Sequence, residues 1–150
     1  MRHLFLLLAT LSVAGCNATA TEVTNMPSNP ATESFAPSLH IDISKMTKTA
    51  SGVYYMDTKV GTGATLTGAP TVSVSYEGYL KDGSIFDPGG SAVFDLGQVV
   101  PGFKDGMQGM KEGGERILVI PSNLGYGPNA QGPIPANATL VFDVILTHIG

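Results

Sequence analysis

The strongest constraint on the fold is a regular alternation of apolar and polar residues in two segments of the chain. In residues 72–77 the apolar side chains are Val72, Val74 and Tyr76, and in residues 140–146 every second residue is again apolar. A period of two places the apolar side chains on one face of a β-strand. Two half-buried strands of this kind predict an antiparallel sheet with one covered face.

The segments around these strands fit a small α+β domain. Lys81-Asp82-Gly83-Ser84 contains the Asp-Gly pair of a hairpin turn, after which Ile85 and Phe86 resume the sheet. Residues 53–56 and 116–120 are further strand candidates. The chain has 19 Gly and 10 Pro in 150 residues and only 13% charged residues, which suits a turn-rich domain. We expect about five antiparallel strands and one short helix.

The best helix candidate runs from Pro101 to Met110. Phe103, Met107 and Met110 share one face of such a helix. Gly106 and Gly109 each lower the intrinsic stability of this helix by about 1 kcal/mol. We therefore expect this helix to depend on packing against the sheet.

The N-terminus predicts export and lipidation. A short basic start precedes a mostly apolar run over residues 4–14, as in a signal peptide. Val13-Ala14-Gly15-Cys16 resembles the bacterial lipobox, which implies cleavage before Cys16 and a lipid anchor on that residue. The alternative is an ordinary secreted protein with one spare thiol. Cys16 is the sole cysteine, so it has no partner for an internal disulfide.

The next residues predict a linker. Residues 17–38 are rich in Thr, Ala, Asn, Ser and Pro and are typical of a flexible tether. Leu39, Ile41 and Ile43 alternate with polar residues, so they form either a short edge strand or part of the linker. We expect a signal peptide over residues 1–15, a lipidated cysteine and linker over 16–50, and a folded domain over 51–150. By resemblance to enterobacterial lipoproteins, Asn17 in place of Asp favours the outer membrane.

Several functional classes are disfavoured by the composition. The net charge is -4 and Lys and Arg are scattered, so a nucleic-acid partner is not expected. His3, His40 and His148 are isolated, without metal-ligand spacing. No Ser or Cys stands with a His as a plausible base, which argues against a hydrolase. The remaining candidate site combines aromatic rings, one aliphatic pair and a single carboxylate, and it suits binding of an apolar peptide.

Four ordered segments carry a resemblance to a known family. They are Val72–Tyr79, Ile85–Asp87, Gly97–Phe103, and Gly125-Tyr126-Gly127 followed by residues 138–144. Their order over about residues 51–150 resembles the FKBP-type peptidyl-prolyl cis-trans isomerase family, here in a bacterial lipoprotein form. The resemblance implies a twisted antiparallel β half-barrel wrapped around one short α-helix, with the site between helix and sheet. It implies no cofactor and no metal.

The resemblance also assigns roles to particular residues. It implies catalytic roles for Asp87, Tyr76 and Tyr126. The implied substrate-binding residues are Phe86, Val99, Val100, Phe103, Ile134 and Phe142.

Two positions depart from the family pattern. Phe103 stands where the family usually has Trp, so the pocket should be wider. Ala92 or Val93 stands near the position of an aromatic wall in many relatives. These departures bear on affinity and substrate preference more than on the type of function.

The implied function is rotation of X-Pro amide bonds to assist the folding of extracytoplasmic proteins. The expected partners are proline-containing polypeptides, the membrane through Cys16, and macrolide inhibitors that mimic a twisted prolyl amide. The alternative is a weakly catalytic or non-catalytic holdase that binds Pro-containing segments on the cell envelope. A carboxylate at Asp87 favours catalysis, because a pure binder has no need of it.

Overall fold

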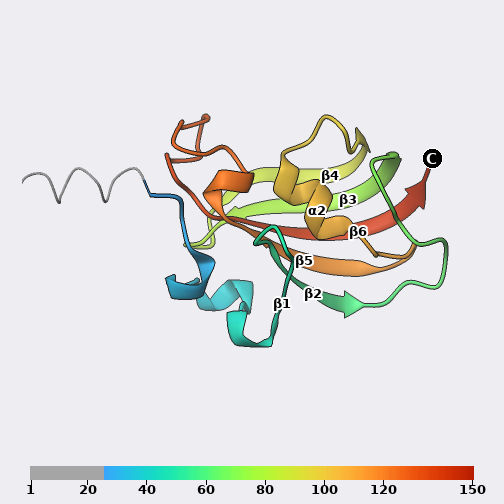
Figure 1. Ribbon diagram of the computed structural model, residues 1–150, viewed down its shortest axis with the longest axis horizontal. Coiled ribbons are helices and arrows are strands. Elements are labelled where there is room, and N and C mark those ends of the chain that lie inside the picture. Colours follow the sequence, from blue (N-terminus) through green and yellow to red (C-terminus); the bar gives the residue numbers. More distant parts are fainter. Residues whose placement is uncertain (1–25) are drawn as a thin grey trace, which may run out of the picture.

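The computed structural model describes residues 26–150 and shows one six-stranded sheet in which every neighbouring pair is antiparallel (Figure 1). The order across the sheet is β1-β2-β5-β6-β3-β4. The strands are β1 (Thr47–Lys48), β2 (Tyr54–Lys59), β3 (Thr71–Leu80), β4 (Ile85–Asp95), β5 (Glu115–Ile120) and β6 (Leu140–Ile149). The predicted signal peptide and Cys16 lie outside the described residues. Within the described residues, no helix has the length and apolar character needed to cross a membrane.

The predicted hairpin is confirmed. β3 and β4 pair through Tyr79 and Ile85, and the Leu80 N–H donates to the Ser84 carbonyl at 2.8 Å. Gly83 has a φ of 89°, a conformation that favours glycine. The Asp82 side chain stabilises the turn, because one of its carboxylate oxygens accepts from the Ser84 N–H at 3.0 Å. β4 extends to Asp95, far beyond the two residues expected from the sequence.

The predicted helix is present but shorter than expected, at α2 (Pro101–Met107). Its two buried glycines let it lie directly on the sheet. A Cβ atom at Gly102 would be 2.3 Å from Ile120 Cγ2, and one at Gly106 would be 2.8 Å from Leu118 Cδ2. Gly109, with a φ of 80°, turns the chain away after the helix. The glycines lower the intrinsic helix propensity, but their lack of a side chain permits close packing of α2 on β5.

One buried arginine connects α2 to the sheet. Arg116 on β5 is 4% exposed, and its guanidinium pairs in a bidentate manner with Asp57 at 2.7 and 3.0 Å. It also donates to the carbonyl oxygens of Gly106 and Gln108 at 2.8 and 2.9 Å. A cation at this position complements the partial negative charge at the helix C-terminus.

The segment before β1 differs from the sequence-based expectation. Residues 28–46, here called the N-terminal strap, form three 3₁₀ turns: η2 (Pro30–Thr32), η3 (Pro37–Leu39) and η4 (Ile43–Lys45). The strap packs on the sheet face opposite α2, where Tyr54, Val119 and Val141 form a second apolar cluster. Phe35 and Leu39 are among the half-buried side chains that cover it.

The strap is therefore neither the expected edge strand at Leu39–Ile43 nor, over its described length, a free tether. His40 has a left-handed φ of 53°, and the Asp42 side chain caps η4 by accepting from the Ser44 N–H. These local contacts favour turns over an extended strand. The edge-strand position belongs instead to β1. The domain start at residue 51 stays a prediction.

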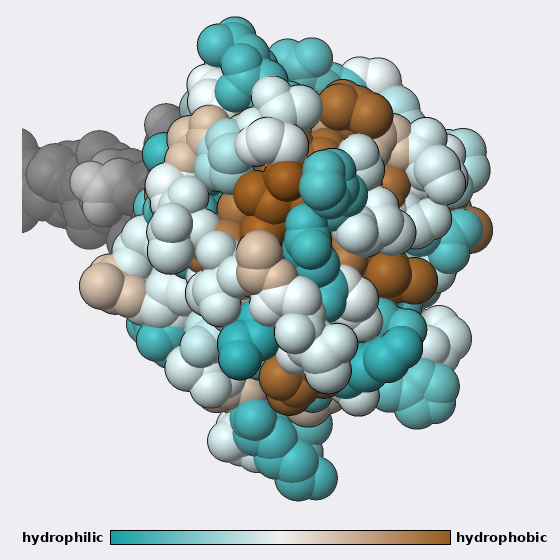
Figure 2. Space-filling view, turned by 90° about the vertical axis from the view of Figure 1, so that its right-hand side faces the viewer, coloured by the Kyte–Doolittle hydropathy of each residue, from teal (hydrophilic) through white to brown (hydrophobic). Residues whose placement is uncertain are grey.

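The main core lies between α2 and the sheet and includes Phe103, Met107 and Met110. The predicted helix face is confirmed for Phe103 and Met107, while Met110 is buried but lies beyond the end of α2. Figure 2 shows that hydrophobic residues reach the surface at one end of the molecule in separate patches between polar ones. Scattered patches of this kind are normal for a small domain.

Candidate functional site

A cavity of about 410 Å³ opens between α2, β3, β4 and the loops that follow β4 and β5. Its size falls in the usual range for ligand pockets, about 300–1,000 Å³. The lining residues are Tyr76, Asp87, Val93, Phe94, Asp95, Gln98, Val99, Val100, Phe103, Tyr126 and Phe142.

Aromatic rings form the inner surface of this cavity. Phe103, on the first turn of α2, is 3% exposed, and its ring centroid lies 5.2 Å from that of Phe142 in an edge-on arrangement. Tyr76 lies 6.5 Å from Phe103 and 6.4 Å from Phe142. Tilted and edge-to-face ring pairs at these distances are favourable. The inner surface of the cavity is therefore a cluster of mutually packed aromatic rings.

The backbone of β3 makes room for this ring cluster. A Cβ atom at Gly78 would be 2.8 Å from the Phe86 ring and 3.1 Å from the Phe142 ring. These two rings meet edge-on at 5.5 Å. The glycine in the segment Tyr76–Tyr79 is therefore a packing requirement of the site.

The carboxylate faces the cavity because of an irregularity in the sheet. The β3–β4 register shifts between Tyr76 and Gly78, so that Tyr76 is opposite Gly90 and Gly78 is opposite Asp87. Bulges of this kind re-aim side chains near functional sites. The Tyr76 hydroxyl donates to one oxygen of Asp87 at 2.8 Å, and the Gly89 N–H donates to the other at 3.0 Å.

The environment of Tyr76 keeps its hydroxyl protonated. Burial, followed by the hydrogen bond and the negative charge of Asp87, raises the pKa of Tyr76 to about 12. The neutral hydroxyl is a donor whose proton is directed at Asp87. The pair therefore places a fixed dipole and a negative charge at the cavity wall.

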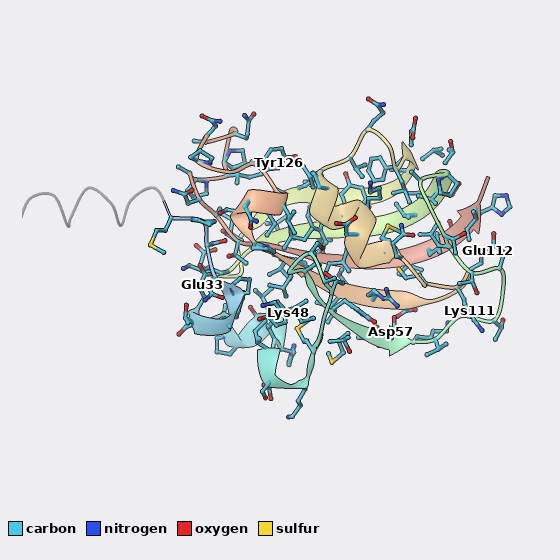
Figure 3. All side chains as sticks on the ribbon, in the orientation of Figure 1. Glu33, Lys48, Asp57, Lys111, Glu112 and Tyr126 are labelled. Atoms are coloured by element: carbon cyan, nitrogen blue, oxygen red, sulfur yellow. The ribbon has the colours of Figure 1, made fainter. Side chains whose placement is uncertain are left out.

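Two further donors lie at the cavity. Val100 is the N-cap residue of α2, and its carbonyl accepts from the Phe103 N–H at 3.0 Å. The Val100 N–H makes no hydrogen bond within residues 26–150, so it is available to a ligand. Tyr126 is 40% exposed and lies on the loop after η5 (Ser122–Leu124), on the same side of the sheet as α2 (Figure 3).

The structure brings seven of the nine predicted site residues to the lining of the cavity. The seven are Tyr76, Asp87, Val99, Val100, Phe103, Tyr126 and Phe142. Phe86 and Ile134 do not line it. Phe86 lies behind Phe142, and Ile134 is 6% exposed in the main core.

One aromatic residue of the cavity was missed by the sequence reasoning. The Phe94 ring lies 5.2 Å from that of Tyr76 and 5.9 Å from that of Phe103. An aromatic wall is therefore present at Phe94, although the sequence analysis counted Ala92 or Val93, near the usual position of that wall, as a departure from the family. The sequence offered no clear signal for it, because Val93 between Ala92 and Phe94 is also apolar, and the role of Phe94 follows from the continuation of β4 to Asp95.

The arrangement is suited to holding an apolar group and orienting carbonyl dipoles. Among residues 26–150 there is no group of three or more His, Cys, Asp or Glu side chains placed to hold a metal ion. The cavity offers an aromatic interior together with a carboxylate, a hydroxyl and a backbone donor.

Comparisons with known proteins agree on one family. Residues 63–147 match the family described as FKBP-type peptidyl-prolyl cis-trans isomerase. The chain is 50% identical over 107 residues to the protein named "Probable FKBP-type peptidyl-prolyl cis-trans isomerase FkpA" of Neisseria meningitidis, with 68% of this chain and 39% of that protein covered. It is 46% identical over 105 residues to FkpA of Aeromonas hydrophila, with 67% and 39% covered. The chain thus spans about two fifths of the length of these curated relatives.

Solved structures show the same similarity. The crystal structure of FkpA from Escherichia coli has a TM-score of 0.67 and 33% identity, over 91% of this chain and 60% of that one. A peptidyl-prolyl cis-trans isomerase from Pseudomonas syringae has a TM-score of 0.68 and 26% identity, over 95% of this chain and 99% of that one. The predicted α+β architecture, an antiparallel sheet with one short helix, is confirmed.

Proposed function

Because this chain belongs to the FKBP-type peptidyl-prolyl cis-trans isomerase family, we propose that it catalyses rotation about X-Pro amide bonds and does so in the aromatic cavity between α2 and the sheet. The observation that carries the proposal is a ring-lined cavity that also contains the Tyr76–Asp87 pair and the Val100 N–H, which makes no hydrogen bond among the described residues. Proline-containing polypeptides are the substrates.

Desolvation supplies one part of the rate enhancement. The X-Pro amide has a rotation barrier of about 20 kcal/mol, because its C–N resonance is lost in the twisted state. The planar amide is the more dipolar form, so water stabilises it more than the twisted form. Transfer into a cavity lined by Phe94, Phe103 and Phe142 removes that advantage of the planar form.

Fixed polar groups supply the other part. The Val100 N–H and the Tyr126 hydroxyl donate to substrate carbonyl oxygens and hold the peptide while the amide rotates. The Asp87 carboxylate, oriented by its bonds from Tyr76 and Gly89, presents negative charge to the carbon of the twisting carbonyl. Such preorganised groups stabilise a transition state without any proton transfer.

Phe103 sets the depth of the cavity. Its ring is smaller than the usual Trp and has no N–H donor, so we propose a wider and less tight seat for the proline ring. Phe94 lines the adjacent wall, where its ring packs edge-on against that of Phe103. Macrolides that mimic a twisted prolyl amide are the expected inhibitors, with binding weakened by the missing indole.

We also propose that the enzyme acts outside the cytoplasm. The signal-like start, the lipobox at Cys16 and the similarity to FkpA proteins support an export signal over residues 1–15 and a membrane anchor on Cys16. Slow X-Pro isomerisation limits the folding of many chains. The role that fits is assistance to the folding of envelope proteins.

The test is exchange NMR with short X-Pro peptides, with Leu or Phe before the proline. The protein is the chain of residues 17–150, which contains every described residue. We expect faster cis–trans exchange that a macrolide inhibitor abolishes. Peptide binding without faster exchange, by a chain shown to be folded, would contradict the proposal and favour the holdase function instead.

A further inference from the structure

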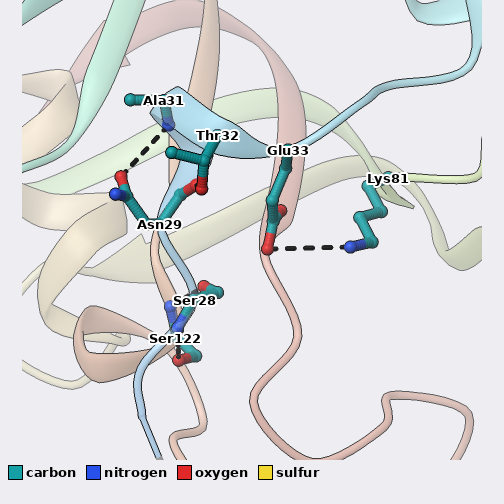
Figure 4. Close-up of polar contacts among 7 residues, drawn as sticks. All are labelled: Ser28, Asn29, Ala31, Thr32, Glu33, Lys81 and Ser122. Carbon is teal, nitrogen blue, oxygen red and sulfur yellow. Dashed lines mark hydrogen bonds and ion pairs between the residues drawn. The ribbon is translucent and has the colours of Figure 1, made fainter. Parts of the chain in front are cut away.

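The N-terminal strap makes a direct polar contact with the base of the loop that carries Tyr126. The Ser28 N–H donates to the Ser122 hydroxyl oxygen at 2.8 Å, and the Ser122 N–H donates to the Ser28 hydroxyl oxygen at 2.7 Å (Figure 4). The two serines are 94 residues apart in the sequence. A reciprocal pair of this kind fixes both backbone position and direction, because each residue contributes one donor and one acceptor.

Ser122 anchors the loop through its backbone carbonyl group. It is 1% exposed, and its carbonyl oxygen accepts from the N–H groups of both Gly125 and Gly127, at 3.0 and 2.8 Å. These glycines flank Tyr126. The far side of the loop is tied by the Asn137 N–H, which donates to the Gly127 carbonyl at 2.8 Å.

Tyr126 depends on these backbone contacts for its position. Its side chain is 40% exposed, so packing alone does not hold it in place. Glycine on both sides leaves the backbone with wide conformational freedom. Gly127 uses that freedom directly, with a φ of 63°. The hydrogen bonds to Ser122 are therefore what select one loop conformation.

Ser28 completes the hydrogen bonding of Ser122. Without the Ser28 hydroxyl, the Ser122 N–H would be a buried donor with no protein partner, a state that proteins avoid. A local shift that brought this N–H to water would move the loop anchored on the same residue.

The rest of the strap does not share this role. Its apolar side chains cover the second apolar cluster on the other face of the sheet. Glu33 lies 3.7 Å from Lys81 of the β3–β4 turn, away from the Tyr126 loop (Figures 3 and 4). Covering the sheet and contacting the loop are thus separable functions of one segment.

We propose that Ser28 is a positioning residue for the isomerase reaction, which acts by holding the Ser122 loop so that the Tyr126 hydroxyl points into the cavity. This inference rests on the proposed function. It makes the segment before the sheet part of the working domain, although that segment lies outside the matched residues 63–147.

The test compares variants of the chain of residues 17–150 in the X-Pro exchange assay. We expect Ser28→Ala to lower kcat three- to tenfold with a smaller change in KM, and Ser28→Thr, which keeps the hydroxyl, to restore most of it. Glu33→Gln is the matched control in the same strap, and its kcat stays within twofold of the unmodified chain. A chain that begins at Asn29 removes the same contact in a second way.

The decisive variant combines Ser28→Ala with Tyr126→Phe. Since Ser28 acts through the tyrosine hydroxyl, the double variant should be no slower than Tyr126→Phe alone. The Tyr126 ring NMR signals should also shift in Ser28→Ala and not in Glu33→Gln. Additive losses, an unchanged kcat in Ser28→Ala, or equal losses in Glu33→Gln would overturn the inference. Inactivity of the unmodified chain would instead overturn the proposed function.

Discussion

Among single side chains, Tyr76 shows most clearly how the fold changes chemistry. Burial and the bond to Asp87 favour its neutral form, so its pKa rises from 10.0 to about 12. Tyr79 has the same pKa, about 12, chiefly because its hydroxyl donates to Glu77. For an acid whose pKa is raised by folding, the stabilisation is complete below pH 10 and is lost as the pH rises through 12.

Titration of the tyrosine absorbance tests this directly. Of the five tyrosines, two should ionise only near pH 12, and Tyr76→Phe should remove one of them. In Asp87→Ala the pKa of Tyr76 should fall but stay above 10, because burial is the larger cause. An unchanged high-pH titration in Tyr76→Phe would contradict the prediction.

A second prediction concerns the two polar side chains Asp87 and Tyr126 at the cavity. Asp87→Ala and Tyr126→Phe should each lower kcat/KM about fivefold or more, since loss of one directed polar contact costs about 1 kcal/mol. Asp105→Ala, on α2, is the control for a lost carboxylate. Exchange NMR measures the rates, and circular dichroism checks the fold. Full activity of Asp87→Ala would show that the charge at the cavity wall has no part in catalysis.

At the level of elements, the helix and the hairpin were predictable because their signals are local. The Asp82-Gly83 turn and the shared face of Phe103 and Met107 follow from short-range patterns. The end of α2 and the length of β4 were not predictable, because they depend on packing against β5 and on hydrogen bonding to β3, which are not local in sequence. The same holds for Phe94, whose role in the cavity follows from the continuation of β4 beside β3.

Gly106 provides the test of helix packing. Gly106→Ala should lower the free energy of unfolding by about 1–3 kcal/mol, because its Cβ would overlap Leu118 although alanine favours helix. Lys104→Ala in the same helix should change it by less than about 0.5 kcal/mol. Urea denaturation measures both. Stabilisation by Gly106→Ala would mean that helix propensity outweighs the close contact with β5.

On the scale of the whole molecule, the two faces of the sheet are covered by different parts of the chain. α2 covers the face with the cavity, and the N-terminal strap covers the other (Figure 1). β1 closes one edge of the sheet, while β4 forms the opposite edge beside the cavity.

Removal of the strap tests its structural part. In a chain that begins at Thr47, the free energy of unfolding should fall by about 3–5 kcal/mol, because five half-buried apolar side chains are removed from the sheet. They are those of Phe35, Leu39, Ile41, Ile43 and Met46. Thermal or urea unfolding of this chain against residues 17–150 gives the difference. Equal stability would show that the strap contributes nothing to the fold.

Periodicity and turn chemistry were enough to predict the α+β class, the hairpin and the buried helix positions, because these signals act over a few neighbouring residues. Most of the cavity residues were predicted through the family resemblance of four ordered segments. The cavity position of Phe94, the core position of Ile134 and the packing of residues 28–46 on the sheet became visible only in three dimensions. The contact between Ser28 and Ser122 joins residues 94 positions apart. Such pairings are selected by the packing of whole elements, which leaves no local pattern in the chain.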